Sequence, residues 1–175
     1  MIDTLFEGLA VQCVGRCDPA KTGLAWSVFL APSELLAAAR RLYEAFYFIE
    51  DLTAIDAKEG YLLVYHFDHM DKPGRVALRV LIPHDAAALP SIAPVFQGAE
   101  WHERETTDFY GIRFDGNPNP VPLLLPPEMT DHPLQKDPEK RAPLATLVAV
   151  GDIVRSTADF FLLPPEAPKP EASGA

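Results

Sequence analysis

The 175-residue chain lacks the motifs that mark a metal or nucleotide site. Its two cysteines, Cys13 and Cys17, are four positions apart. A structural zinc ion or an iron–sulfur cluster takes about four ligands, so this pair is too small and is expected to be two reduced thiols beside a strand. The sequence also lacks a Gly-x-Ser-x-Gly motif, a glycine-rich phosphate loop and a dinucleotide fingerprint. Catalysis by this chain alone is therefore unsupported.

Positive charge and long apolar runs are also scarce. The chain has 15 Lys and Arg against 25 Asp and Glu, a formal net charge of -10. Without a basic stripe to neutralise phosphates, nucleic acid is excluded as a partner, and docking on an anionic membrane surface is disfavoured. No run approaches the ~18 apolar residues of a spanning helix, so direct membrane insertion is not expected. Acids near the start, where a signal peptide carries Lys or Arg, favour a cytoplasmic location.

Hydrophobic patterning predicts an α+β domain over residues 1–111. Residues 33–46 have a helical period, with Ser33 as the N-cap. Alternating or continuous apolar runs indicate strands, and a short connection at 70–74 makes the last two a hairpin. The expected strands span residues 24–30, 47–55, 61–67 and 75–82. The fold class is therefore a mixed or antiparallel sheet of about four strands, with helices packed on one face.

Proline dominates the segment that follows. Eight prolines lie between residues 112 and 144, and this density blocks both helices and central strands. The segment nevertheless contains valine and leucines that need burial, so its composition is not that of a disordered chain. We expect residues 112–163 to form an extended strap that wraps another subunit, and residues 164–175 to be a disordered tail.

Residues 98–111, GAEWHERETTDFYG, are the most charged and aromatic-dense stretch and are expected to form a helix between two glycines. One apolar face of this helix would carry Trp101, Glu105, Phe109 and Ile112. This pattern predicts that Glu105 is buried, and a buried carboxylate needs a partner. The partner is either an arginine of the same domain or a donor across a subunit interface. The candidates within the domain are Arg75, Arg79 and Arg113.

The other charges of this helix do not form a catalytic pair. Glu103 and Glu105 are two positions apart and diverge on a helix, so they are unsuited to paired acid–base chemistry. Arg104 and Asp108 are four apart and are expected to bridge on the exposed side, a contact of about 0.3–0.5 kcal/mol. The spacing thus favours an electrostatic brace over an active site.

Three motifs in this order carry a family resemblance. The central one has the pattern Trp-x-Glu-Arg-Glu-x-x-Asp-x-x-Gly-Ile-x-Phe, an upstream one is Leu-Thr-x-x-Asp, and a downstream one is His-Pro-Leu-x-Lys-Asp. The matching positions are Leu52, Thr53, Asp56, Trp101, Glu103, Arg104, Glu105, Asp108, Gly111, Ile112, Phe114, His132, Pro133, Leu134, Lys136 and Asp137. Together they resemble the 30-kilodalton subunit family of respiratory complex I. Equivalent subunits of energy-converting nickel–iron hydrogenases and formate hydrogenlyases belong to the same family.

The resemblance implies a subunit with no catalytic residue, metal or cofactor of its own. Such a subunit docks on a large hydrogenase-like subunit and a small iron–sulfur subunit, so the chain would be part of a hetero-oligomer. The iron–sulfur clusters and the nickel or quinone site would lie in those partners. The complex would place the chain at the cytoplasmic face of the cell membrane, as a peripheral component. The signature positions would then serve partner docking.

The chain departs from the complex I pattern after Phe114. An arginine pair of the family is missing from residues 116–124, and Gln135 stands where the family has arginine. Loss of basic residues at a subunit contact suggests a different partner surface, which slightly favours the energy-converting hydrogenase type. The alternative assignment of the chain is the 30-kilodalton subunit of an NADH:quinone oxidoreductase. A more remote alternative is a free-standing enzyme that uses Glu103, Glu105 and Asp108, or an unrelated interaction domain.

Overall fold

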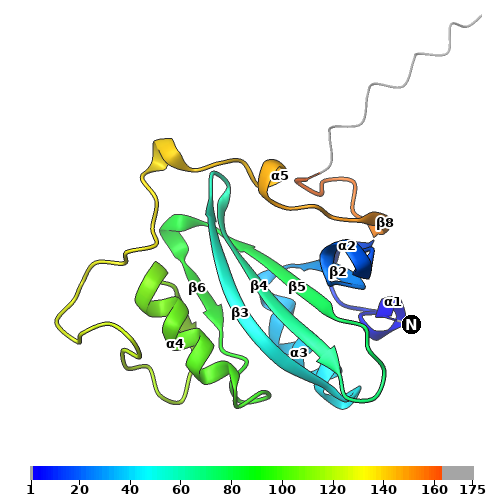
Figure 1. Ribbon diagram of the computed structural model, residues 1–175, viewed down its shortest axis with the longest axis horizontal. Helices are drawn as coiled ribbons and strands as arrows, with labels where there is room; N and C mark the ends of the chain where they lie inside the picture. The colour runs from blue at the N-terminus through cyan, green and yellow to red at the C-terminus, as the bar shows by residue number, and fades with distance from the viewer. Residues whose placement is uncertain (1, 163–175) are drawn as a thin grey trace, which may run out of the picture.

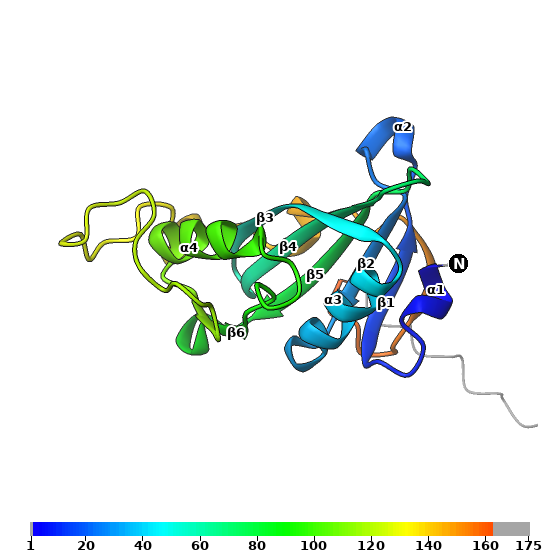
Figure 2. The same ribbon diagram turned by 90° about the horizontal axis from the view of Figure 1, so that it is seen from below.

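The computed structural model describes residues 2–162 and has the expected α+β class (Figures 1 and 2). Its centre is a six-stranded mixed sheet with the order β3-β4-β5-β2-β1-β8. These strands are β1 (Val11–Arg16), β2 (Trp26–Leu30), β3 (Tyr47–Ala57), β4 (Gly60–His69), β5 (Val76–Ile82) and β8 (Asp152–Ser156). A separate parallel pair joins β6 (Ala88–Pro90) to β7 (Arg113–Asp115).

Two of the helices span ten or more residues, and the others span four. The helices are α1 (Ile2–Leu5), α2 (Pro19–Thr22), α3 (Leu35–Glu44), α4 (Ala99–Tyr110) and α5 (Leu144–Leu147). Short 3-10 turns lie at Pro32–Glu34, His84–Ala86 and Pro138–Lys140. The first of these turns leads into α3, so Ser33 does not cap that helix as expected. Within residues 2–162, no helix combines the length and apolarity needed to cross a membrane.

The four expected strands are confirmed, and the sheet is larger by two. The predicted hairpin is the antiparallel pair β4–β5, whereas β5 and β2 are parallel. The added strands β1 and β8 pair with each other at one side of the sheet. All five residues of β8 are exposed, so this strand forms through backbone pairing and carries no clear apolar alternation.

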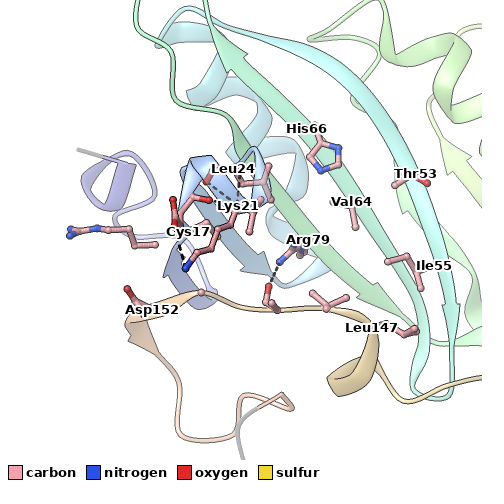
Figure 3. Close-up of a pocket in the computed structure, with 16 residues that line it drawn as sticks. Cys17, Lys21, Leu24, Thr53, Ile55, Val64, His66, Arg79, Leu147 and Asp152 are labelled. Carbon is pink, nitrogen blue, oxygen red and sulfur yellow. Dashed lines mark hydrogen bonds and ion pairs between the residues drawn. The ribbon is translucent and has the colours of Figure 1, made fainter.

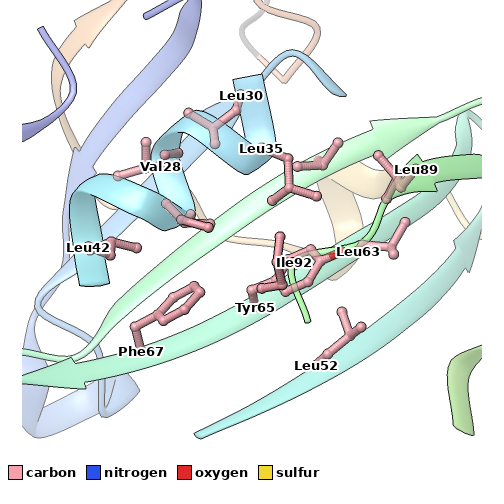
Figure 4. Close-up of a cluster of buried hydrophobic side chains, with 14 of the residues drawn as sticks. Val28, Leu30, Leu35, Leu42, Leu52, Leu63, Tyr65, Phe67, Leu89 and Ile92 are labelled. Atoms are coloured by element: carbon pink, nitrogen blue, oxygen red, sulfur yellow. The ribbon is translucent and has the colours of Figure 1, made fainter. Parts of the chain in front are cut away.

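The central strands bury both of their faces, because successive side chains point to opposite sides of the sheet. In β4, Leu63, Tyr65 and Phe67 belong to the larger core, which α3 covers (Figure 4). Their neighbours Leu62 and Val64 belong to a second core on the opposite face. The expectation that helices cover only one face was incomplete, since α5 contributes to this second core.

The proline-rich strap is part of the domain at both of its ends. Near its start, β7 pairs with β6. Near its end, Leu144 and Phe160 are buried in the second core and β8 adds to the sheet. Only the middle of the strap runs as an extended loop along α4 (Figure 1). The boundary expected at residue 112 therefore does not separate a globular part from a detached one. The expected tail, 164–175, lies outside the described residues.

Replacing Phe160 with alanine tests this assignment. Phe160 is 3% exposed, and its ring centroid lies 4.9 Å from that of Phe29 in an edge-to-face arrangement. We expect Phe160→Ala to lower the free energy of unfolding by about 3–5 kcal/mol in guanidinium denaturation. The exposed neighbour Asp159 is the control, and Asp159→Ala should change it by less than about 0.5 kcal/mol. Equal values for the two variants would contradict a packed C-terminal segment.

Candidate functional site

The central signature motif forms helix α4. It lies beside β3, the outermost strand of the sheet (Figure 1). Gly111 ends it in the left-handed conformation, with φ 71°, and donates its N–H to the Thr107 carbonyl at 2.8 Å. Glycine adopts this conformation at little cost, and a Cβ here would lie 2.6 Å from the His132 ring. The helix expected at residues 98–111 is thus confirmed.

Glu103 is the buried carboxylate of this helix. Its side chain is fully buried, and its Oε2 accepts hydrogen bonds from Ser91 Oγ at 2.6 Å and Asn117 Nδ2 at 2.7 Å. Its Oε1 accepts one from the Ile92 N–H at 2.8 Å. Burial raises the pKa of Glu103, and these three donors oppose that rise. One side chain therefore fastens the helix to the loop before it and to the loop after it.

The assignment of Glu105 to a buried face was wrong. Glu105 is exposed, and Trp101, expected on the same face, is 63% exposed. The helix instead buries Ala99, Glu103 and Thr106, which follow one another at the helical spacing of four and three. The apolar pattern misled because the buried face of α4 is largely polar and is satisfied by side chains and backbone of the flanking loops. Glu105 needs no internal partner, and Arg75 and Arg113 pair elsewhere, with Glu50 and Asp115.

Arg104 and Asp108 hold the strap and do not bridge to each other. Asp108 is 7% exposed, and its Oδ2 accepts the N–H groups of three consecutive leucines. These are Leu123 at 2.9 Å, Leu124 at 2.7 Å and Leu125 at 3.0 Å. Arg104 donates to the carbonyls of Val121 at 2.9 Å and Pro122 at 3.1 Å, and it pairs with Glu100 at 3.2 Å. The two side chains therefore do not form the expected ion pair. Asp108 accepts backbone N–H groups of the strap, and Arg104 donates to backbone carbonyls of the same strap.

The downstream His-Pro-Leu motif caps the C-terminus of α4. The last carbonyls of a helix have no partner within it, and here side chains and backbone of residues 132–135 supply donors. His132 Nδ1 donates to the Asp108 carbonyl at 2.8 Å, and the Leu134 N–H donates to that of Phe109 at 3.1 Å. Gln135 Nε2 donates to the Tyr110 carbonyl at 2.8 Å.

The remaining signature positions differ in burial. Phe114 is packed in the larger core, whereas Pro133 and Leu134 are exposed. Asp137 is also exposed and pairs with Lys140 at 2.5 Å. The Lys136 side chain is exposed as well, so the part of Lys136 that is held is its backbone N–H.

Asp56 accepts the hydrogen bond from the Lys136 N–H. It belongs to the upstream Leu-Thr-x-x-Asp motif of the family resemblance. It is 1% exposed, and its Oδ2 accepts the Lys136 N–H at 2.7 Å. Its Oδ1 lies 2.8 Å from His84 Nε2 and 2.9 Å from Arg141 Nε. Residue patterns alone did not indicate this role, because His84 and Lys136 lie 28 and 80 positions away in sequence. Asp56 therefore anchors the strap to β3.

The polar side chains brought together at α4 are engaged with backbone and loop groups. In residues 2–162 there is no group of three or more His, Cys, Asp or Glu placed to hold a metal ion. Burial alone would raise the pKa of Asp108, but the three leucine N–H groups and nearby Arg104 hold it below its ordinary value. A carboxylate kept ionised by three backbone donors acts as a structural acceptor. This arrangement is that of a brace between a helix and an extended strap.

The fold and this helix define an α+β domain whose outermost strand is covered by a carboxylate-bearing helix with its own strap. Residues 28–143, which include the helix and its capping motif, match the model of the respiratory-chain NADH dehydrogenase 30 Kd subunit. The chain belongs to that family.

Its relatives include components of bacterial NADH-quinone oxidoreductases. The C/D component of the Methylococcus capsulatus enzyme is 41% identical over 102 residues, which are 53% of this chain and 17% of that protein. The C component of the enzyme from Caulobacter sp. strain K31 is 39% identical over 145 residues, 75% of this chain and 66% of that protein. The chain thus spans less than two thirds of either relative.

A solved structure shares the fold. It is a chain from the membrane-bound sulfane sulfur reductase, an archaeal respiratory membrane complex. The TM-score is 0.64 at 23% identity, and the match covers 83% of this chain and 86% of that one.

Replacing Glu103 with alanine should destabilise the domain far more than replacing Glu105. The Glu103→Ala change leaves three donors unpaired at a buried site, and each costs about 1–3 kcal/mol. We expect a loss of about 3 kcal/mol or more in urea denaturation. Glu105→Ala should stay within about 0.5 kcal/mol, as for other exposed positions. A larger loss for Glu105→Ala would contradict the burial described here.

The hold of Asp108 on the strap should weaken in acid. Because its pKa in the folded protein lies below the ordinary value, its stabilising effect is complete above that ordinary value and is lost as pH falls through the folded-state pKa. Amide hydrogen exchange of residues 123–125 should then accelerate relative to the core strands. In Asp108→Asn the same amides should exchange faster at neutral pH, by roughly tenfold, and lose the acid dependence. Asp131→Asn, at an exposed acid of the same strap, is the control and should leave these amides unchanged.

Proposed function

We propose that the chain is a non-catalytic subunit of a complex I-like respiratory oxidoreductase of the NADH:quinone type. The observation that carries the proposal is the family match over residues 28–143, together with relatives that are themselves named as components of NADH-quinone oxidoreductases. The fold of α4 and its strap supports a structural role, since their polar groups are paired with one another. Electron transfer would be the work of the partner subunits.

The NADH:quinone type is preferred over the hydrogenase type that the strap sequence slightly favoured. That preference came from residues that replace the family pattern after Phe114 and at Gln135. Two of these residues make internal contacts: Asn117 donates to Glu103, and Gln135 caps α4. Their identity is explained by the brace itself, so it requires no altered partner surface. The hydrogenase type stays the second candidate.

The proposed partners are a large hydrogenase-like subunit and a small iron–sulfur subunit. The C/D name of the Methylococcus capsulatus relative assigns two components to one protein, and this chain matches 17% of that protein. A separate D component, which we equate with the large hydrogenase-like subunit, is therefore the first partner expected for this chain. The clusters and the quinone site would lie in these partners, and the chain would sit at the cytoplasmic face of the membrane as a peripheral component.

The outer face of α4 is the proposed docking surface. It carries Trp101, 63% exposed, and Glu105, and the strap adds Leu134, 48% exposed. Exposed aromatic side chains are enriched in the centres of protein interfaces, where they account for much of the binding energy. The inner face of the helix is occupied by the brace and is not available to a partner.

Co-purification tests this function. A tagged full-length chain, expressed in cells that make the rest of the complex, should bring down the large hydrogenase-like subunit and the small iron–sulfur subunit, detected by mass spectrometry. Trp101→Ala should reduce their yield roughly tenfold or more, as for an interface hot spot. Met70→Ala is the matched control, since Met70 is 67% exposed but lies in the turn after β4. A stoichiometric metal or flavin in the purified chain, or NADH oxidation by it alone, would overturn the proposal.

A further inference from the structure

A cavity on the sheet face opposite α3 plays no part in the brace at α4. It has a volume of about 630 Å³ and lies between the sheet and the segment 147–152 (Figure 3). Its walls include apolar side chains from three strands or their flanks, namely Leu24, Ile55 and Val64. Small-molecule sites have volumes of about 300–1,000 Å³ with mainly apolar walls, so this cavity is large enough for a ligand.

A buried arginine lies at this cavity. Arg79 of β5 is 9% exposed, and it lines the space together with the strand residues around it. Its Nη1 donates to Ser27 Oγ and to the Ala149 carbonyl, the latter at 3.1 Å. Its guanidinium carbon lies 5.4 Å from the centroid of the Phe29 ring. These contacts involve Nη1 and the flat face of the guanidinium group. The edge formed by Nε and Nη2 makes no hydrogen bond with the described residues.

That edge has no counter-charge. Nε is buried without a hydrogen-bond acceptor among residues 2–162, and Arg79 takes part in none of the ion pairs that these residues form. An unpaired buried charge is costly, and burial accordingly lowers the pKa of Arg79. Nε is covered by protein atoms, so Nη2 is the donor of this edge that a ligand would meet, and an N–H of a charged guanidinium forms a strong hydrogen bond with a carboxylate oxygen.

Several other charged groups that line the cavity have partners of their own. Lys21 pairs with Asp18 at 3.6 Å, and His66 Nδ1 lies 2.6 Å from an oxygen of Asp51. Arg16 lies over the Trp26 ring, 5.3 Å from its centroid. A further acid, Asp152, lines the cavity near Cys17 and forms no ion pair with Arg79. Arg79 is thus the cation that a ligand would neutralise.

We propose that this cavity binds a carboxylate with an apolar body, held by Nη2 and the positive charge of Arg79. The apolar wall of the cavity would receive the body of the ligand. The carboxylate has two conceivable sources: a small free molecule or an acidic side chain of a neighbouring subunit. Only the second source rests on the proposed function.

Octanoate is the probe for the first source. The full-length chain, labelled with ¹⁵N-arginine, is titrated with octanoate while the Arg79 Nε–Hε resonance is followed, with octanamide as the uncharged match. We expect a downfield shift and a rise in Tm of at least about 2 °C with octanoate alone. Arg79→Lys, which keeps the charge but removes the Nη2 donor, should abolish the rise in Tm. Arg75→Lys is the control, because Arg75 already pairs with Glu50 and should leave the rise intact.

Cross-linking tests the second source. In the assembled complex, a zero-length carbodiimide should join the Arg79→Lys side chain to an Asp or Glu of a neighbouring subunit, identified by mass spectrometry. If Arg79→Lys does not fold, the comparison of octanoate with octanamide on the wild-type resonance still decides the first source. An octanoate response or a cross-link at this position supports the site. Equal responses to octanoate and octanamide, with no cross-link, would overturn it, whether or not the subunits co-purify.

Discussion

The buried carboxylate of Glu103 is the interaction on which the site depends. It accepts hydrogen bonds from a serine and a backbone N–H that precede α4 and from an asparagine that follows it. An ionised group away from water is tolerated only when donors replace its hydration. Here the donors come from two loops with no regular structure of their own, so the carboxylate and the loops each depend on the other. Loss of either partner leaves the other unsatisfied.

The same logic explains how a proline-rich strap is ordered. An extended segment without a neighbouring strand exposes backbone groups that need partners. Proline removes donors, and the donors that remain at residues 123–125 are all accepted by Asp108. Arg104 binds the carbonyls just before them, and Asp56 accepts the N–H of Lys136. Side chains of the folded domain thus take the place of a sheet ladder.

Much of the fold could be predicted from the sequence, because its central strands are nearly continuous apolar runs and α4 lies between two glycines. The pairing of β8 with β1 could not, since β8 is exposed on every residue and its position is set by a strand far away in the sequence. The helix at residues 98–111 was predicted correctly, but the face that it buries was not. The apolar side chains Trp101 and Phe109 suggested one inner face, whereas the helix turns its polar side chains Glu103 and Asp108 inward. Single-sequence periodicity cannot detect loop donors that lie far away in the chain.

This inversion separates two roles within one motif. The inward residues Glu103 and Asp108 are committed to intramolecular acceptor roles, and their loss acts on the fold. The outward residues Trp101 and Glu105 are exposed, which suits the docking role that we propose for this face. Residues two apart on a helix point in different directions, so this motif of alternating acids has inward side chains that serve the fold and outward side chains that stay exposed. On the opposite side of the sheet, Arg79 is a buried charge without an ion-pair partner among the described residues, which is why we propose an anionic ligand there.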